Sequence, residues 1–335
     1  IESGHPFNRE PVGNGPMRLA SWSGEDRIRL VRLHDRQLFE FLTVKDSTVR
    51  VLKLVRGEID LIQGDVPFEL LDWLSKQGSV TVETLSGNIF TYIGFNLQDP
   101  ALKKQSVRRA IASAIDRDTI ITHVLGNAAR KAGAMLPPDH WAGHPGLSGY
   151  AYDPGLSRRL LADAGYNNDN PLHLTYKTSS NPLRVRLATI IQYQLGEVGI
   201  DIDVQSYDWG TFYGDIKSGK FQLYSLSWVG LNLPDIFRYV FHSESVPPAG
   251  ANRGRYDDPV TDKLIEQAAA YNDTERQAVI YRRLQERLHQ QLPYVPLWYE
   301  DNILARRKSI RGYTLQTDGN FDGLVETHRH TETMQ

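Results

Sequence analysis

Hydrophobic residues recur along the chain with two spacings, one typical of amphipathic helices and one typical of strands. From Val107 to Ile115 they fall at i, i+3, i+4, i+7 and i+8, which predicts a helix with Arg108 and Arg109 on its solvent face. The helical spacing and its capping residues predict further helices over residues 46–55, 116–125, 153–164, 187–195, 259–270 and 274–290. Alternation and short apolar runs predict strands over residues 17–22, 28–32, 39–42, 61–62, 91–96, 172–176, 200–204, 223–227 and 293–299.

The order of these elements predicts an α/β fold. Residues 172–176, 187–195 and 200–204 form a strand–helix–strand unit with short connections, so its strands are expected to be parallel with a right-handed crossover. The strand at 223–227 would be the next one in that sheet. A Pro/Gly-rich stretch over residues 136–146 is typical of a crossover between domains. The polar tail from His328 onward is expected to fray.

Trp228 stands at the end of the 223–227 strand, directly before the turn-prone sequence Gly230-Leu-Asn-Leu-Pro234. In open α/β sheets, ligands bind just beyond the carboxyl ends of the strands, so an aromatic there is a candidate wall of a binding cleft. Buried indoles are also common in cores and interfaces. The strand alone leaves both interpretations open.

Composition narrows the class of protein. The 335 residues are enough for two cores, and the net charge of −2 gives no electrostatic reason to expect a nucleic-acid partner. No apolar run is long enough to span a bilayer, and the start does not resemble a signal peptide, so we expect that any targeting peptide has been removed or was never there. With no cysteine, disulfides, thiolate metal sites and cysteine nucleophiles are excluded.

The chemical motifs favour binding over catalysis. No Gly-x-Ser-x-Gly elbow, His-Glu-x-x-His or other catalytic set is present. Gly13-Asn-Gly15 lacks the third glycine of a phosphate loop and precedes Pro16, which indicates a structural turn. His328 and His330 have metal-like spacing without a further ligand nearby. We therefore expect that the protein is not an enzyme and that it has no cofactor and no metal site.

Aromatic and amide side chains provide the candidate ligand-binding residues. Aromatics make up 10% of the chain, which suits binding through rings and equally suits a large core. Rings with a few polar fixing groups are the usual make-up of a small-molecule site, and an arginine offers a partner for an anionic group. The candidates are Trp228, Tyr224, Asn232, Tyr92, Asn96, Trp209, Asn252 and Arg253, and for each a purely structural role is the open alternative.

Six motifs in order resemble those of the family 5 extracellular solute-binding proteins, the oligopeptide- and dipeptide-type receptors of ABC importers. Pro11-Val-Gly-Asn-Gly-Pro-Met-Arg-Leu19 is similar to the family's "PVGTGPYKL" element. The other motifs are Leu54-Val-Arg-Gly-Glu-Ile-Asp60, Tyr92-Ile-Gly-Phe-Asn96 with Val107-Arg-Arg-Ala-Ile111, Tyr152-Asp-Pro with Leu161-Ala-Asp-Ala-Gly-Tyr166, Asp262-Lys-Leu-Ile-Glu-Gln-Ala268, and Pro293-Tyr-Val-Pro-Leu297. Trp228 falls at the family's "gW..D.pdp" element, whose tryptophan faces the cleft in relatives.

The resemblance implies an α/β, two-lobe periplasmic-binding-protein-like (class II) fold, with mixed sheets flanked by helices and a discontinuous first lobe. Residues 1–143 and 294–335 would form lobe one and residues 144–293 lobe two, with Tyr92 and Asn96 facing Trp228 from the other lobe. The protein would be periplasmic or extracellular. Its lobes would close by a hinge on a peptide-like or other polar organic solute, which it would deliver to an ABC permease.

Two departures from the family pattern qualify this expectation. The chain begins almost at the "PVGTGP" element, so the N-terminal part of lobe one is expected to be missing, or to be supplied by a separate chain or segment. The alternative function is therefore a sensory or regulatory solute-binding module, or a partner-dependent fragment not itself engaged in transport. The acid three residues after the family's tryptophan is Leu231 here, and the arginine three residues before it is Ser225, so ordinary free peptides lose two charged partners.

Overall fold

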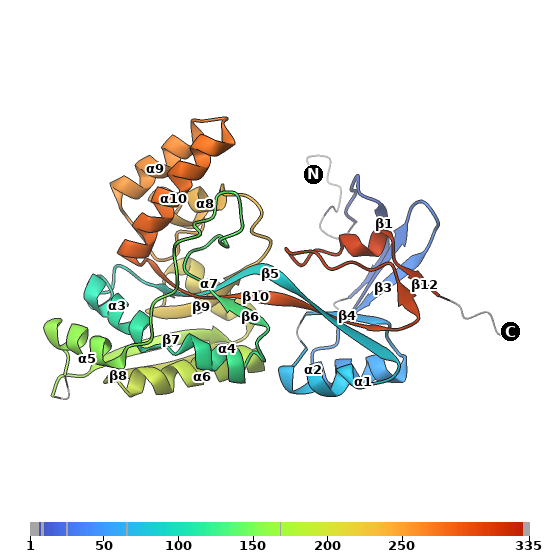
Figure 1. Cartoon of the computed structure of the whole chain (residues 1–335), viewed down its shortest axis with the longest axis horizontal. Coiled ribbons are helices and arrows are strands. Elements are labelled where there is room, and N and C mark those ends of the chain that lie inside the picture. Colours follow the sequence, from blue (N-terminus) through green and yellow to red (C-terminus); the bar gives the residue numbers. More distant parts are fainter. Residues whose placement is uncertain (1–6, 8–9, 25, 65, 168, 331–335) are drawn as a thin grey trace. The chain divides into compact units, whose positions relative to one another are not determined.

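The computed structural model describes residues 7, 10–24, 26–64, 66–167 and 169–330. The chain forms two compact units, Ile1–Leu85 with Asn302–Gln335, and Ser86–Asp301 (Figure 1). The first unit is discontinuous in sequence, as the resemblance implies for lobe one. The expected lobe boundaries at residues 143 and 293 both fall inside the second unit, as does the 136–146 crossover. The lobe division at those points stays a prediction.

The first unit begins with an antiparallel sheet in the order β1-β2-β3, which confirms the three strands predicted there. Its strands are β1 (Met17–Ser23), β2 (Arg27–Arg32) and β3 (Leu38–Leu42). The helix α1 (Ser47–Arg56) follows, because the Asp46 carboxylate accepts a hydrogen bond from the Val49 N–H. It ends where Gly57 adopts a left-handed φ of 78°, a conformation that glycine takes without strain.

The rest of the first unit comes from both ends of the chain. β4 (Leu61–Gln63) pairs with the final part of β10 (Tyr294–Arg307), and α2 (Phe68–Ser75), which the pattern did not reveal, lies between β4 and β5 in the chain. A 3-10 helix, η1 (Asp322–Val325), precedes β12 (His328–Arg329), which pairs with β11 (Ile310–Arg311). The expectation that the tail frays from His328 onward is therefore wrong for His328 and Arg329, because ladder hydrogen bonds hold both residues. Residues 331–335 lie outside the described residues.

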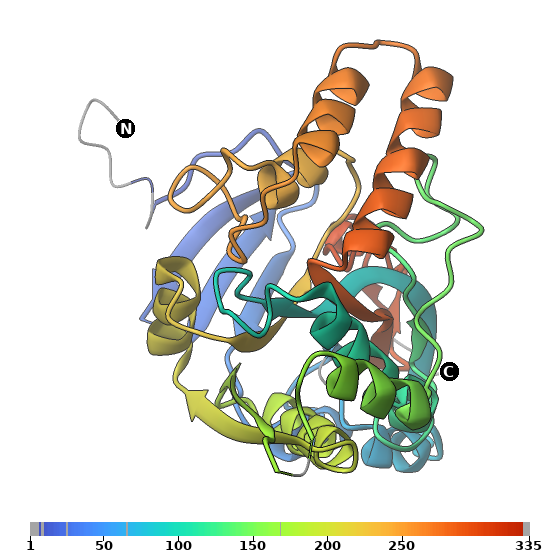
Figure 2. The same ribbon diagram turned by 90° about the vertical axis from the view of Figure 1, so that its left-hand side faces the viewer.

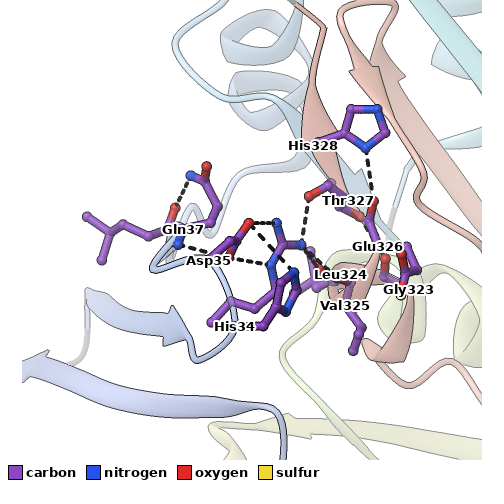
Figure 3. A network of polar contacts seen from close by, with 11 residues as sticks. His34, Asp35, Gln37, Gly323, Leu324, Val325, Glu326, Thr327 and His328 are labelled. Atoms are coloured by element: carbon purple, nitrogen blue, oxygen red, sulfur yellow. Dashed lines mark hydrogen bonds and ion pairs between the residues drawn. The ribbon is translucent and has the colours of Figure 1, made fainter.

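Arg32, at the end of β2, holds the segment before β12 by hydrogen bonds. Figure 3 shows Asp35 and Leu324, Val325 and Thr327 of this polar network. Its guanidinium donates to the carbonyl oxygens of Leu324, Val325 and Thr327 at 2.7–2.8 Å and forms two hydrogen bonds with the Asp35 carboxylate. The hydrogen bond with Arg32 holds the pKa of Asp35 well below its ordinary value. A buried cation thus satisfies three carbonyls that lie almost 300 residues away in sequence.

The second unit is built on a mixed sheet in the order β10-β5-β9-β7-β8, with β6 (Ala129–Lys131) pairing with β10. β7 (Leu172–Ser179) is parallel to both β8 (Ile200–Tyr207) and β9 (Leu223–Trp228), which confirms the predicted strand–helix–strand unit and its neighbour. β5 (Val80–Phe95) is antiparallel to β9. The carboxyl ends of β7, β8 and β9 therefore meet at one edge of this sheet.

Helices flank this sheet and close two cores against it. They are α3 (Gln105–Ala114), α4 (Arg117–His123), α5 (Pro154–Asp163), α6 (Pro182–Gly196), α7 (Trp209–Ser218), α8 (Ile236–Phe241), α9 (Pro259–Ala269) and α10 (Thr274–Gln291). α9 and α10 pack side by side as a helical hairpin (Figure 2). One core contains Ile93, Phe95 and Leu223, and the other contains Phe90, Tyr92 and Tyr224. Because side chains alternate along β5 and β9, the two cores lie on opposite faces of the sheet.

Arg108 departs from its predicted place on the solvent face of α3. Its side chain is only 5% exposed and donates to the carbonyl oxygens of Leu102, Lys103, Gln291 and Leu292 at 2.6–2.9 Å. The last two carbonyls end α10, where backbone acceptors have no partner within the helix. Arg109 is exposed as predicted.

Candidate ligand-binding site

Trp228 is the last residue of β9, at the carboxyl edge of the parallel strands. It pairs with Phe90 of β5, and the next pairs along the same face are Tyr92 with Leu226 and Gly94 with Tyr224. Gly230 then takes a left-handed φ of 71°, so the chain turns away immediately beyond the tryptophan. The sequence thus places an aromatic where this fold presents ligands.

Three further aromatic rings and one guanidinium form a continuous set of contacts that begins at Trp228. The Arg253 guanidinium lies over the Trp228 ring at 4.8 Å and over the Tyr213 ring at 5.5 Å. Tyr213 stacks on Trp209 with ring centroids 5.3 Å apart, and Tyr239 meets Trp228 edge-on at 6.2 Å. We call these five residues the aromatic shelf. Trp209 is 58% exposed and Tyr239 48% exposed, so both outer members offer ring surface to a ligand.

Buried tyrosines hold the guanidinium of Arg253 in place. Arg253 donates to the hydroxyl oxygens of Tyr92 at 3.1 Å and Tyr213 at 3.3 Å. Tyr92 stacks on Tyr294 at 4.1 Å and meets Tyr224 edge-on. Burial raises the pKa of Tyr92, Tyr224 and Tyr294, so all three hydroxyls are neutral at physiological pH. Arg253 is a cation at physiological pH, because the ordinary pKa of an arginine lies far above that pH and two hydroxyl oxygens accept hydrogen bonds from its guanidinium.

A second polar group lies on the opposite face of the same strand end. The Thr91 hydroxyl hydrogen-bonds Ser227 at 2.6 Å and donates to the Glu300 carboxylate at 2.5 Å. Arg184, in the first turn of α6, donates to both oxygens of that carboxylate at 2.9 and 3.3 Å. Burial raises the pKa of Glu300, but its interactions with Arg184 and Thr91 outweigh this effect and hold the pKa below its ordinary value. Glu300 is therefore an anion that Arg184 already neutralises.

The structure brings five of the eight predicted site residues together. Trp228, Arg253 and Trp209 belong to the aromatic shelf, while Tyr92 and Tyr224 are fully buried beneath it. Tyr92 was expected to face Trp228 from the other lobe, but it packs with Tyr224 in a core of the second unit, the unit that also contains Trp228.

The three predicted amides lie elsewhere in the second unit. Asn252 is buried and uses both ends of its amide to hold its own loop, donating to the carbonyls of His242 and Tyr256. Asn96 lies at the opposite end of the β5–β9 pair from Trp228 and donates to backbone carbonyls, including that of Phe221 at 3.0 Å. Asn232 is exposed in the turn after β9, where its side chain accepts from Asn88. These contacts give each amide a structural role.

Several residues at this strand end were not among the candidates. Tyr213 follows Trp209 at i+4 on α7, so helical spacing placed both rings on one face and was a usable signal. Tyr239, Arg184 and Glu300 come from distant segments, and no local pattern marks them. Leu231, at the position where the family resemblance implies an acid, is buried in a core, so it offers neither charge nor side-chain hydrogen bond there.

A separate hollow of about 460 Å³ lies in the first unit, between β3, β4 and the segment around η1 and β12. The Asp60–Arg329 ion pair, at 2.7 Å, forms part of its lining. None of the predicted site residues lines it.

The described ranges contain no group of three or more His, Cys, Asp or Glu residues placed to hold a metal ion. Within the same ranges, no helix combines the length and the apolar character needed to cross a membrane.

Residues 2–246 match the family described as "Bacterial extracellular solute-binding proteins, family 5 Middle". The chain therefore belongs to this family, which confirms the resemblance seen in its motifs. Among solved structures, a periplasmic binding protein DppA from Helicobacter pylori, in complex with the peptide STSA, is similar with a TM-score of 0.86 and 26% identity. That similarity covers 96% of this chain and 64% of the other, and it confirms the periplasmic-binding-protein-like α/β fold class.

Two curated relatives with similar sequences are named as peptide-binding proteins. A "Di/tripeptide-binding protein 2" from Pseudomonas aeruginosa is 28% identical over 93% of this chain, and the "Dipeptide-binding protein" of Escherichia coli is 26% identical over 95%. The chain spans about 60% of the length of these relatives. The relatives are binding proteins by name, not enzymes.

Proposed function

We propose that this chain captures a peptide-like or other polar organic solute on the aromatic shelf and presents it to an ABC permease. It acts by binding alone, without catalysis. The observation that supports this proposal is the position of the shelf. In a family 5 fold, Trp228 stands at the carboxyl edge of parallel strands with a cation stacked on it and partly exposed rings on either side.

The shelf favours a ligand that combines flat or apolar surface with a few polar groups. Rings recognise such surface with little loss of side-chain freedom, while Arg253 fixes a polar end. The peptide STSA in the Helicobacter protein and the names of the curated relatives support a peptide-like solute. Leu231 and Ser225 remove the charges that would pair with the ends of a free peptide, so the solute is expected to have other polar groups at those places.

Location and mechanism follow from the same proposal. The protein acts outside the cytoplasmic membrane, in the periplasm or the extracellular space, as the family description supports. Closure of its lobes by a hinge would be driven by a ligand that contacts both. The eight residues named from the sequence remain candidates, with Trp228, Arg253 and Trp209 as the direct contacts and Tyr92 and Tyr224 as their support.

The test is to identify the solute that the protein carries when it is purified. Mass spectrometry of the denatured wild-type protein should detect a stoichiometric small molecule, and adding it back should raise the melting temperature of the emptied protein. Trp228→Ala should lose that solute. Trp141→Ala, which removes a partly exposed tryptophan in the same unit but outside the shelf, should keep it. A solute retained equally by both variants would place binding elsewhere, and a protein with no solute at all would contradict the receptor function.

A further inference from the structure

Arg253 is a buried cation without an anionic partner among the described residues. The residue is only 6% exposed. Its contacts are the hydroxyls of Tyr92 and Tyr213 and the ring faces of Tyr213 and Trp228. All of these are neutral groups. Buried charges in proteins are normally paired, because removing a charge from water is costly.

No group around Arg253 supplies the missing charge by ionising. Burial raises the pKa of Tyr92, Tyr224 and Tyr294, so no tyrosinate forms near neutral pH. The carboxylate of Glu300, which Arg184 neutralises, lies on the opposite face of the β5–β9 pair. The positive charge of Arg253 therefore stays uncompensated within the described chain.

The hydrogen-bonding groups of the shelf show the same imbalance. An arginine offers five N–H donors and no acceptor, and within the described residues two of the five donate, to Tyr92 and Tyr213. The indole Nε1–H of Trp228, whose ring lies under the guanidinium, is buried and has no acceptor in the described chain. An indole nitrogen is also a donor only. The Arg253 guanidinium and the Trp228 indole thus bring N–H donors without acceptors together at the aromatic shelf.

We propose that Arg253 and the Trp228 indole N–H bind a carboxylate of the captured solute, which makes this protein a receptor for carboxylate-bearing organic solutes. A carboxylate supplies the one negative charge that matches the one uncompensated cation, and its oxygens accept from both donors. A ring-bearing or aliphatic part of the same solute then lies on Trp209 or Tyr239. This inference rests on the proposed solute-binding function.

The site also explains why the guanidinium lies over two rings. Stacking on Trp228 and Tyr213 partly offsets the cost of burying the charge in the empty protein. It leaves the N–H groups, which lie in the plane of the guanidinium, available at its rim. Tyr92 and Tyr213 each occupy one of them and fix the orientation of the plane.

The experiment compares wild type, Arg253→Gln and Arg238→Gln, each purified in parallel and denatured to release its solute. Arg238 is an exposed arginine of α8 and serves as the matched control. The released solute is treated with an amine and a carbodiimide, which converts a carboxylate to an amide of known added mass. We expect a solute that reacts in this way, at least tenfold lower occupancy in Arg253→Gln, and unchanged occupancy in Arg238→Gln. A tenfold loss is the lower end of the effect of removing a charged hydrogen-bonding partner.

Two further readouts keep the result decisive. Emptied Arg253→Gln should melt at the same temperature as emptied wild type or higher, because it removes an unpaired buried charge, so loss of solute cannot be ascribed to misfolding. A solute that lacks a carboxylate, a phosphate ester included, or one that stays bound to Arg253→Gln, would overturn the carboxylate inference and leave the receptor function standing. If wild type carries no solute and no member of a panel of organic acids and their neutral amides raises its melting temperature, both proposals fail.

Discussion

Gly94→Ala tests the packing that supports Arg253. Gly94 lies directly opposite Tyr224 in the β5–β9 pair, and the Tyr224 ring covers it. A Cβ atom added at Gly94 would lie 2.3 Å from Cζ and 2.4 Å from Cε1 of that ring. Carbon atoms in contact normally lie about 3.5–4.0 Å apart, so the ring must move by more than about 1 Å.

The surroundings leave Tyr224 no room for this movement. Its ring is fully buried and packs edge-on against Phe221 at 4.7 Å and Tyr92 at 5.9 Å. Overpacking a core costs about 1–3 kcal/mol, and disrupting an aromatic pair costs about 0.5–1.5 kcal/mol. We therefore expect Gly94→Ala to lower the free energy of unfolding by about 2–4 kcal/mol.

Urea unfolding of purified variants measures this change. The matched control is Gly214→Ala in the exposed interior of α7, where an added Cβ meets nothing within 4 Å. It should be neutral or stabilising by up to about 1 kcal/mol, since alanine is the better helix former. Tyr224→Leu removes the ring atoms that the added methyl group would strike, so combining it with Gly94→Ala should cost clearly less than the sum of the single changes. Strict additivity, or a Gly94→Ala protein as stable as wild type, would refute the packing described.

Three further predictions concern charged side chains that the fold holds in place. Asp258→Asn should cost about 1–2 kcal/mol at about pH 7, because Asp258 caps α9 and accepts two hydrogen bonds from Arg287. The Arg287 hydrogen bonds hold the pKa of Asp258 below its ordinary value, so the carboxylate's contribution to the free energy of unfolding is present above about pH 3.9 and is lost as the pH falls below that. Urea unfolding at about pH 3 should therefore show a smaller difference between wild type and Asp258→Asn than at about pH 7. The same difference at both pH values would contradict this role of Asp258. Arg108→Met should cost at least about 3 kcal/mol in the same assay because it leaves four carbonyls without their donor, while Arg109→Met on the same helix should stay within about 0.5 kcal/mol, so equal costs would be evidence against the burial of Arg108. Arg32→Met should speed amide hydrogen exchange, read by mass spectrometry, in β12 and in the segment before it; unchanged exchange there would mean that other contacts hold this segment.

Local sequence signals predicted the helices and strands well where each element carries its own pattern. Asp46 and Gly57 mark the two ends of α1, and the apolar stripe from Val107 marks α3. The strand–helix–strand unit fixed the parallel pairing of β7 with β8. α2 was missed because its eight residues, Phe68–Ser75, show only a short apolar run.

Side-chain roles that depend on distant partners could not be predicted in this way. Arg108 occupies a polar position of the α3 pattern, but two of the four carbonyls that it binds lie at the end of α10, more than 180 residues further along the chain. Asn96 and Asn252 were candidates for polar groups that fix a solute, and in the structure both amides bind backbone groups of their own loops or of neighbouring turns. Amides are equally suited to either task, so composition cannot separate the two.

The candidate site was predictable to the extent that the topology fixed it. The strand end at Trp228 followed from the fold class, because open α/β sheets present ligands at that edge. Arg253 was named as a partner for an anion, but its burial and its stacking on Trp228 emerge only when β9 and the loop before α9 come together.

Binding on the aromatic shelf is tested most directly by the indole N–H spectrum of the protein as its co-purified solute is added back. The chain has six tryptophans, so single Trp→Phe variants can assign each ¹⁵N-labelled indole signal. We expect the Nε1–H signals of Trp228 and Trp209 to shift when the solute is added, and the signal of Trp141 to stay unchanged. If other signals shift while those of Trp228 and Trp209 do not, the solute does not bind on the aromatic shelf.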